Sequence, residues 1–366
     1  MKITVIGAGL AGLTAAHRLQ QAGFSVNVLE RGQLPGGRMA QAHDVGLNYL
    51  TGARLIYSFS KSVMGLVREL GLTDQLCRGL TTPVTTCSQA GEHSVQIGPG
   101  PGLMFNSRFS YGQRWCLLQM AVGMVGRRFS TNPDRLLDWQ HHDEGTLYEY
   151  LHQRSLDQVS RIFIEPVFRG ARGWRMTDVS PVFFLSTTAH MYGAHAYTFD
   201  GGIGLLTERL AQNLDVTYSV DVKNVRRAIS GGNELSYELN GLLQSTHADL
   251  VICAVPGSLP LRIVSVPTPE ESQFFKCVKY NSGYILHFGI DRAVEPYVRF
   301  FGSDVNASIA ALEVVDQSGI SSSYLSRISV YLSPEAVIKL KTNPLVEDEL
   351  PAIWNDLPDD VARQLE

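Results

Sequence analysis

Three glycines near the N-terminus have the spacing of a dinucleotide-binding turn. Gly7, Gly9 and Gly12 form a Gly-x-Gly-x-x-Gly pattern, and the acidic residue Glu30 follows at the distance expected for a ribose ligand. The first glycine permits a tight turn, the second lets a pyrophosphate approach the backbone, and the third allows close helix–strand packing. A carboxylate at Glu30 would accept hydrogen bonds from a ribose 2′-hydroxyl and repel a 2′-phosphate. The pattern therefore predicts a dinucleotide other than NADP.

The residues around these glycines predict the elements that must position them. Residues 3–6 form an apolar, β-branched run, which is typical of a buried strand. Residues 10–19 carry apolar side chains at a spacing of three, which predicts a helix, and residues 26–29 predict a second strand. Leu10 and Ala11 would form the first helical turn, whose N-terminus faces the phosphates. A structural turn that binds no nucleotide is the alternative.

A second glycine pair follows the second strand. Arg31 comes directly after Glu30, and Gly36, Gly37 and Arg38 lie beyond a short loop. Two glycines beside an arginine can bring backbone and a guanidinium against a diphosphate. A plain NAD-binding unit needs no such block, so the second pair favours FAD.

With both motifs, the sequence resembles the FAD-dependent amine oxidase superfamily. This group includes monoamine and polyamine oxidases, protoporphyrinogen oxidases, carotenoid desaturases and renalase-like proteins. Residues 44–53 and 198–228 are similar to two later blocks of the family. The resemblance implies that Glu30 binds the adenosine ribose, Arg38 the diphosphate and the Val222 backbone the adenine. The expected cofactor-binding residues are Gly7, Gly9, Leu10, Ala11, Gly12, Glu30, Arg31, Gly36, Gly37, Arg38 and Val222.

The resemblance also implies the fold. We expect an α/β chain with a Rossmann-like FAD-binding domain and an interleaved α+β substrate-binding domain. Residues 1–57 with 196–256 would form the first, without its C-terminal part, and residues 58–195 with 257–366 the second. Within them, residues 216–222 alternate as a strand, residues 248–256 resemble a buried strand of the parallel sheet, and residues 283–290 predict an antiparallel strand.

Two departures from the family pattern bear on the chemistry. Many amine oxidases carry a lysine that holds a water against the flavin, but the comparable stretch offers Tyr284, with Lys276 and Lys279 ahead of it. Tyr284 is thus a candidate near the flavin, and the catalytic residues are otherwise undefined. The family's closing Gly-Asp block, which holds the ribityl-phosphate end of FAD, does not follow before Glu366. We expect its absence to weaken flavin binding.

The resemblance implies an FAD-dependent oxidase or dehydrogenase. A hydride would pass from a substrate C–H to the flavin, leaving an imine or a double bond in an amine or N-containing metabolite. O₂ or another acceptor would then reoxidise the flavin. No cysteine or histidine lies in a family attachment motif, so we expect non-covalent FAD. The alternatives are a desaturase of an apolar polyene or porphyrinogen-like substrate, a non-catalytic flavin-fold binding module and an NAD-dependent dehydrogenase.

Composition narrows the choice of partners. The chain of 366 residues has a net charge of -4, which gives no electrostatic argument for a nucleic-acid partner, so we expect a small-molecule substrate. Five scattered cysteines without a CxxC pattern fit a reducing cytoplasm. No uncharged run reaches the roughly 20 residues of a membrane span, whereas contact with a membrane surface stays open. The sequence does not define the oligomeric state.

Histidines and tryptophans offer further candidates. His190 and His195 are too far apart for one helical face and the adjacent His141 and His142 would point apart, so we expect no metal site. The tryptophans could line a substrate cavity, although buried aromatic residues more often belong to the core. Those considered are Trp115, Trp139 and Trp174.

Overall fold

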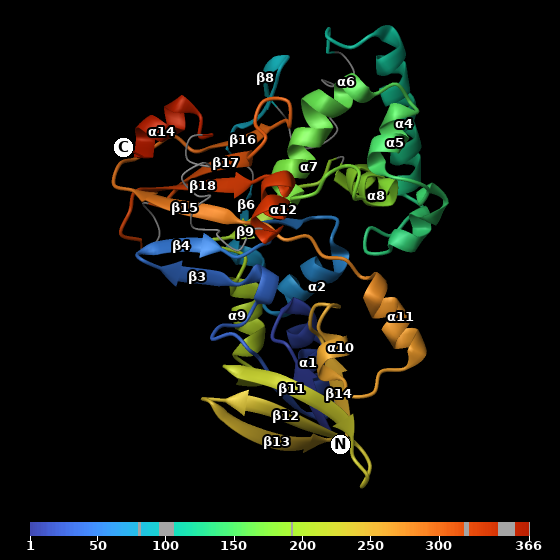
Figure 1. The fold of residues 1–366 in the computed structure, drawn as a ribbon, viewed down its shortest axis with the longest axis vertical. Coiled ribbons are helices and arrows are strands. Elements are labelled where there is room, and N and C mark those ends of the chain that lie inside the picture. The colour runs from blue at the N-terminus through green and yellow to red at the C-terminus, as the bar shows by residue number, and fades with distance from the viewer. Residues whose placement is uncertain (80–81, 95–105, 192, 318–321, 343–355, 366) are drawn as a thin grey trace.

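The computed structural model describes residues 1–366 apart from residues 80–81, 95–105, 192, 318–321, 343–355 and 366. Figure 1 shows two halves stacked along the longest axis of the molecule. The parallel-sheet half, which holds the N-terminus, comprises residues 1–36 and 205–264. The mixed-sheet half comprises the described residues within 84–191 and 285–365. The elements between them are η1 (Gly37–Met39), β3 (Gln41–Asp44), β4 (Leu47–Leu50), β5 (Ile56–Tyr57), α2 (Lys61–Glu69), η2 (Thr73–Gln75), β6 (Leu76–Arg78), β9 (Ala196–Phe199) and α11 (Pro269–Cys277).

A four-stranded parallel sheet forms the centre of the parallel-sheet half, in the order β10-β2-β1-β14. The first strand lies between its neighbour in sequence and a strand from much later in the chain, with Ile3 opposite Leu250. The strand predicted within residues 248–256 is therefore confirmed in the parallel sheet, but its predicted burial is wrong, because it lies at the sheet edge with Leu250 43% exposed. Leu13 and Ala16 are fully buried in the core that joins the first helix to the sheet. The elements are β1 (Lys2–Ile6), α1 (Leu10–Gln21), β2 (Ser25–Leu29), α9 (Leu205–Ala211), β10 (Asp215–Thr217), β14 (Leu250–Cys253) and α10 (Pro260–Ile263).

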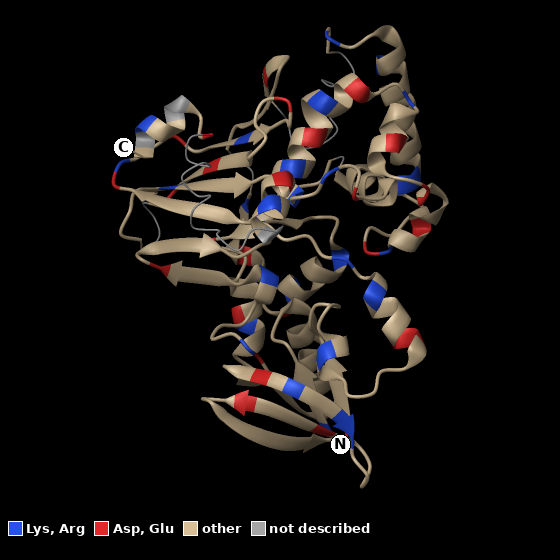
Figure 2. Cartoon of the chain, in the orientation of Figure 1, with Lys and Arg blue, Asp and Glu red and all other residues tan. Residues whose placement is uncertain are grey.

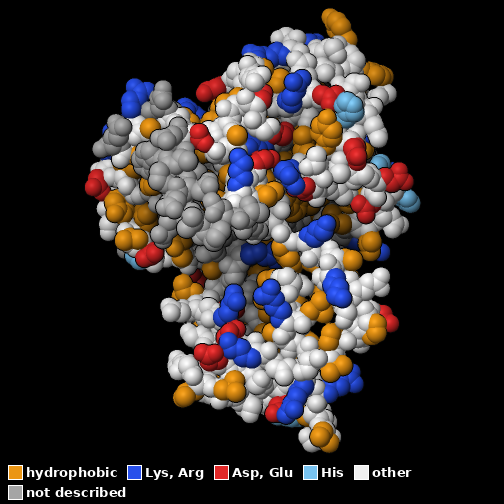
Figure 3. All heavy atoms as spheres, viewed as in Figure 1, with side chains coloured by type: hydrophobic (Ala, Val, Ile, Leu, Met, Phe, Trp, Pro, Cys, Tyr) orange, Lys and Arg blue, Asp and Glu red, His pale blue; other side chains and the backbone are white. Residues whose placement is uncertain are grey.

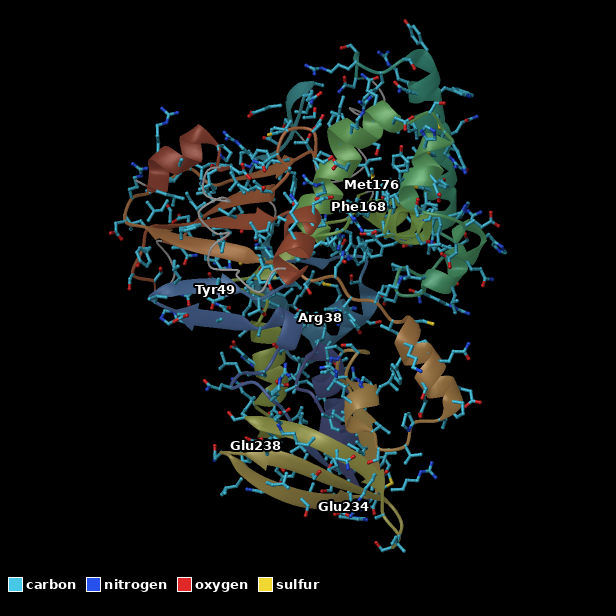
Figure 4. All side chains as sticks on the ribbon, viewed as in Figure 1. Arg38, Tyr49, Phe168, Met176, Glu234 and Glu238 are labelled. Carbon is cyan, nitrogen blue, oxygen red and sulfur yellow. The ribbon has the colours of Figure 1, made fainter. Side chains whose placement is uncertain are left out.

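The continuous strand predicted over residues 216–222 is wrong. The backbone turns at Ser219, whose φ is +58°, and the chain leaves the parallel sheet there for an antiparallel sheet of order β11-β12-β13. Opposite charges face each other on that sheet, with Lys223 3.1 Å from Glu238 and Arg226 2.9 Å from Glu234 (Figures 2 and 4). Its strands are β11 (Val220–Arg227), β12 (Asn233–Leu239) and β13 (Leu242–Ala248).

The mixed-sheet half is built on a six-stranded sheet of order β15-β18-β17-β16-β7-β8. All of its pairs are antiparallel except the pair that joins residues 84–87 to residues 298–301. Leu312, Ile328 and Val330 are fully buried on one face, where Val361 of the last helix covers them. The predicted strand at 283–290 is confirmed by β15. The elements are β7 (Val84–Ser88), β8 (Gly91–Ser94), β15 (Ile285–Ile290), β16 (Tyr297–Phe301), β17 (Ile309–Asp316), β18 (Ser326–Leu332), α12 (Pro334–Thr342) and α14 (Asp359–Leu365).

Helices cover the other side of this half (Figure 1). A buried arginine, Arg169, fastens one of them to the sheet by donating hydrogen bonds to the carbonyl oxygens of Phe301 (2.8 Å) and Asn306 (3.2 Å). The same guanidinium lies 3.1 Å from Glu335 and 3.6 Å from Glu165. The helices are α4 (Tyr111–Arg128), η3 (Leu136–His142), α5 (Leu147–His152), α6 (Asp157–Val159), η4 (Ser160–Ile164), α7 (Glu165–Arg172) and α8 (Pro181–Met191).

Candidate functional site

A cavity of about 4240 Å³ extends from the first glycine turn into the mixed-sheet half. Figure 3 shows the molecule narrowing where the two halves meet, with several Lys and Arg side chains along this waist. All but one of the expected site residues line the cavity, the exception being Gly12. The lining residues among them are Gly7, Gly9, Leu10, Ala11, Glu30, Arg31, Gly36, Gly37, Arg38, Val222 and Tyr284.

The first glycine turn is sterically demanding at two positions. Gly7 has a φ of +103°, which L side chains rarely adopt, and a Cβ atom there would lie 2.8 Å from the Ala254 carbonyl oxygen. A Cβ on Gly12 would lie 1.9 Å from the Gly7 carbonyl oxygen. Gly12 is therefore a packing residue that lets α1 approach β1. A Cβ on Gly9, by contrast, would meet nothing within 4 Å, so the backbone there is open to a ligand.

Glu30 directly follows β2, beside this turn. Its carboxylate accepts hydrogen bonds from the backbone N–H groups of Ala8 (2.6 Å) and Gly32 (2.7 Å). Two ionised oxygens offer about four acceptor positions, so these two bonds leave capacity for a ribose hydroxyl. The carboxylate thus both fixes the glycine turn and faces the cavity.

The second glycine pair lies directly against the first turn. The N–H of Gly36 donates to the Ala8 carbonyl oxygen at 2.8 Å, and a Cβ on Gly37 would lie 3.5 Å from the Gly9 Cα. Arg38 follows at the waist between the halves (Figure 4) and makes no ion pair with the residues that the structure describes. Its carbonyl oxygen accepts from the Ala53 N–H at 2.8 Å, which joins the block at residues 44–53 to the same loop.

These residues fit a dinucleotide cofactor. The first N–H groups of an α-helix lack acceptors within the helix and carry the positive end of its dipole, which favours a phosphate. At the start of α1, Leu10 and Ala11 line the cavity behind the open backbone of Gly9. Arg38 adds a positive charge on the opposite loop. Val222 of β11 also lines the cavity.

A charged cluster lies deeper in the cavity and was not among the residues singled out from the sequence. The Glu313 carboxylate accepts from the Arg54 guanidinium and lies 3.8 Å from Arg327. The guanidinium of Arg54 also covers the Tyr331 ring at 4.6 Å, and the Tyr331 hydroxyl lies 3.4 Å from the Glu313 carboxylate. Alternation along β17 and β18 places Glu313, Arg327 and Tyr331 on the face that lines the cavity. In the sequence, these residues have the same pattern as charged residues on a solvent-exposed strand face.

Burial lowers the pKa values of two basic side chains at this cluster. The Arg327 side chain is 8% exposed, and burial lowers the pKa of its guanidinium, with Arg54 adding repulsion and Glu313 opposing it. On the neighbouring strand, the pKa of His287 is lowered to about 4 by burial and by Arg327 and Arg54. His287 is therefore neutral near pH 7. Its ring lies 4.7 Å from the Tyr49 ring, and its Nδ1 lies 2.9 Å from the Ser329 hydroxyl.

Two tyrosines also line this part of the cavity. Tyr284 lies directly before β15 and is 40% exposed, and its carbonyl oxygen accepts from the Leu332 N–H. Tyr57 is more deeply placed, and burial raises the pKa of its hydroxyl while Arg172 lowers it. Of the two lysines near Tyr284, Lys279 lines the cavity. Tyr57 and Arg172 were not singled out from the sequence.

The part of the cavity in the mixed-sheet half has many apolar lining residues, with charged side chains such as Arg172, Arg175 and Asp178 among them. The three candidate tryptophans lie in different surroundings. Trp174 lines the cavity, Trp139 is 1% exposed within a helical core, and Trp115 is 61% exposed on the protein surface. Phe168 of α7 lies above Arg38 in Figure 4. The apolar lining includes Leu117, Met120, Met124, Phe163, Val167, Phe168, Val182, Phe183 and Phe184.

No group of three or more His, Cys, Asp or Glu side chains in the described part of the chain is placed to hold a metal ion. No helix in the same residues has the length and apolar character needed to cross a membrane.

Comparison with known proteins identifies a family of flavin-containing oxidoreductases. The sequence profile described as flavin containing amine oxidoreductase matches residues 10–334. A zeta-carotene-forming phytoene desaturase from Myxococcus xanthus is 25% identical over 355 residues, which cover 84% of this chain and 64% of the desaturase. A lysine-specific histone demethylase 1 homolog 3 from Oryza sativa subsp. indica is 26% identical over 267 residues, which cover 69% of this chain and 30% of that protein. The chain thus spans less than two thirds of either relative.

Solved structures share the fold. A redesigned putrescine oxidase, the A394C-A396T-Q431G triple mutant, superposes with a TM-score of 0.72 at 17% identity. The superposition covers 100% of this chain and 83% of the oxidase. The expected α/β fold is confirmed by this match, whereas the domain boundaries and the cofactor contacts of individual residues stay predictions.

Proposed function

Since the chain belongs to the flavin-containing amine oxidoreductase family, we propose that it binds FAD without a covalent bond and removes a hydride from a substrate C–H. The substrate in this proposal is an amine or N-containing metabolite, and the product is an imine or a compound with a new double bond. The observation that carries the proposal is the continuous cavity. It joins the two glycine loops to the Arg54–Glu313–Arg327 cluster and to an apolar chamber beyond it.

The parallel-sheet half would hold the cofactor. The N-terminus of α1 and Arg38 would bind the diphosphate, and Glu30 would bind the ribose. FAD, when bound, supplies the hydride acceptor and is reoxidised by O₂ or another acceptor. The protein's own contribution is to orient the substrate and to exclude water, so a dedicated acid–base pair is not required.

The mixed-sheet half would orient the substrate. Glu313 is the acidic side chain that the described part of the six-stranded sheet contributes to the cavity, and it would pair with a substrate nitrogen in competition with Arg54. Tyr57 stays a neutral hydrogen-bond donor because burial raises its pKa. The aromatic and methionine side chains beyond the cluster would surround the apolar part of the substrate.

The second candidate is desaturation of an apolar substrate at a C–C bond. The apolar lining from α4, α7 and α8 favours it, as does the similarity to a phytoene desaturase over 84% of this chain. In that case the Glu313 cluster would close the end of the chamber rather than bind a nitrogen.

The first experiment is a visible absorption spectrum of the purified protein, followed by acid precipitation. We expect bands at about 450 nm, about one FAD per chain, and release of the flavin into the supernatant. Flavin retained on the precipitate would contradict non-covalent binding. A colourless protein that FAD does not reconstitute would contradict the flavoenzyme and favour the binding module, and co-purified NAD would favour a dehydrogenase.

The second experiment separates the two substrate classes. Anaerobic bleaching of the flavin is followed with panels of amines and of polyenes, in wild type and in Glu313→Gln. If the substrate is an amine, Glu313→Gln should keep its flavin and bleach at least about tenfold more slowly, because a neutral amide binds an ammonium poorly. Glu234→Gln, on the surface of β12, is the matched control. Equal bleaching rates in all three proteins would overturn the role of Glu313.

A further inference from the structure

The exposed side of α4 is apolar. Its solvent-exposed large side chains recur at helical spacing and continue to the residue that caps the helix. We call this set the α4 outer face: Tyr111 (88% exposed), Trp115 (61%), Leu118 (40%), Val122 (65%) and Phe129 (84%). The remaining exposed positions of the helix are glycines and the polar Gln119. A helix on a protein surface normally shows its charged side to water, and α4 does the opposite.

Basic residues accompany this apolar face within its own stretch of chain. Residues 93–133 contain no Asp or Glu. The arginines in this stretch lie in the helix and next to its two ends: Arg108, Arg114, Arg127 and Arg128. The Arg114 guanidinium lies over the Tyr111 ring at 5.4 Å, so aromatic and basic groups meet at the start of the face.

The α4 outer face continues to the cavity. Leu118 and Val122 are exposed to solvent and also line the cavity, as do the exposed Leu136 and Leu137 that follow the helix. The inner residues of the same helix, such as Leu117 and Met120, line the apolar chamber. One apolar surface therefore runs from the outside of the protein to its interior along the outer edge of the mixed-sheet half, where Figure 1 shows α4.

We propose that the α4 outer face docks on the surface of a membrane that contains anionic phospholipids. An interfacial helix buries aromatic and aliphatic side chains among the headgroups while arginines meet lipid phosphates. α4 has both groups, and it is not apolar enough to cross the bilayer. A second copy of the chain fits less well, because two such faces would bring like-charged arginines together.

Docking there would place the cavity mouth against the bilayer. An apolar molecule dissolved in the membrane could then reach the chamber without crossing water, which is favourable because it stays in an apolar environment. This consequence rests on the proposed function, whereas docking itself does not.

The test is sedimentation of the flavin-loaded protein with vesicles of phosphatidylcholine, with and without phosphatidylserine. We expect binding to the anionic vesicles that weakens with added salt. Trp115→Glu and Val122→Glu should each weaken it at least about tenfold, since each removes an apolar anchor and adds a negative charge. Arg114→Gln should weaken it about fivefold.

Matched controls come from exposed apolar residues far from α4. Leu243→Glu on β13 (74% exposed) and Val266→Glu (85%) make the same chemical change and should leave binding within about twofold of wild type. Circular dichroism and flavin content verify that each variant is folded. Absence of wild-type binding, equal loss in the controls, or equal binding to neutral vesicles would overturn the proposal. A dimer that Trp115→Glu dissociates, in the absence of vesicle binding, would assign the face to a second copy. Because vesicle binding needs no turnover, its failure leaves the proposed oxidoreductase untouched.

Discussion

The two halves of the cavity are built in different ways. At the parallel-sheet end, residues 7–38 supply the turn, the carboxylate, the second glycine pair and the arginine from one continuous stretch. At the mixed-sheet end, the charged cluster combines Arg54, from the segment between the halves, with Glu313 and Arg327 from two strands that lie far along the chain. The difference teaches that steric demands within one turn leave a readable sequence pattern, whereas a cluster assembled by tertiary packing leaves almost none.

The largest expected effect tests the steric demand of the first half. Gly12→Ala should destabilise the protein by about 4 kcal/mol or more and abolish flavin binding, because its Cβ would lie 1.9 Å from a backbone oxygen. Urea unfolding and flavin content measure this. Gly65→Ala in α2, where a Cβ meets nothing within 4 Å, should instead stabilise by about 0.5–1 kcal/mol. Wild-type stability and flavin content in Gly12→Ala would contradict the steric demand that we assign to the first glycine turn.

The next effect concerns long-range assembly of the second half. Arg169→Met should lower the free energy of unfolding by about 3 kcal/mol, because it leaves a buried carboxylate and several carbonyl oxygens without their donor. Glu335→Gln removes a partner that is 38% exposed and should change stability by less than about 1 kcal/mol. Urea denaturation compares the two variants. An equal loss in both would show that the pair with Glu335, rather than the buried bonds, fastens α7.

A smaller effect appears as pH dependence. The pKa of His287 is about 4 in the folded protein and about 6.5 when unfolded, so between these values only the unfolded chain binds the proton. Stability should therefore fall as the pH drops from 6.5 towards 4, by about 2 kcal/mol once partial exposure is allowed for. His287→Gln should remove that part of the slope and the exposed His141→Gln should retain it. Thermal unfolding across this range gives the comparison, and parallel slopes for wild type and His287→Gln would contradict it.

The smallest expected effect is on the affinity for FAD at the proposed nucleotide site. Glu30→Ala should weaken FAD binding about tenfold, because the Ala8 and Gly32 N–H groups lose their shared acceptor and the ribose loses its ligand. Glu30→Gln keeps one acceptor oxygen and should have an intermediate affinity. Titration of the flavin-free protein with FAD measures both. Wild-type affinity in Glu30→Ala would remove this carboxylate from the proposed cofactor site.

The features that could be predicted from the sequence depend on interactions between residues close together in the chain. The strand–turn–helix unit and the strand β14 follow from apolar periodicity and glycine spacing, and most of the expected cofactor residues do line one cavity. The break at Ser219 was missed because alternation continues through it while the chain changes sheets. Trp115 was considered for the cavity, but its helix turns it outward. Glu313 was missed because a charged residue within a strand also fits a solvent-exposed face.

The pairing of β1 with β14 has a consequence for synthesis of the chain. Strand β1 can pair with β2 as soon as β2 leaves the ribosome. The other edge of β1 stays unpaired until β14, which contains Leu250, has been synthesised. At about 5–20 residues per second, this interval is on the order of tens of seconds. During that time a short, apolar strand edge next to the glycine turn stays open to other chains. Binding of nascent chains by a chaperone should therefore be strongest before residue 253 emerges and decline afterwards.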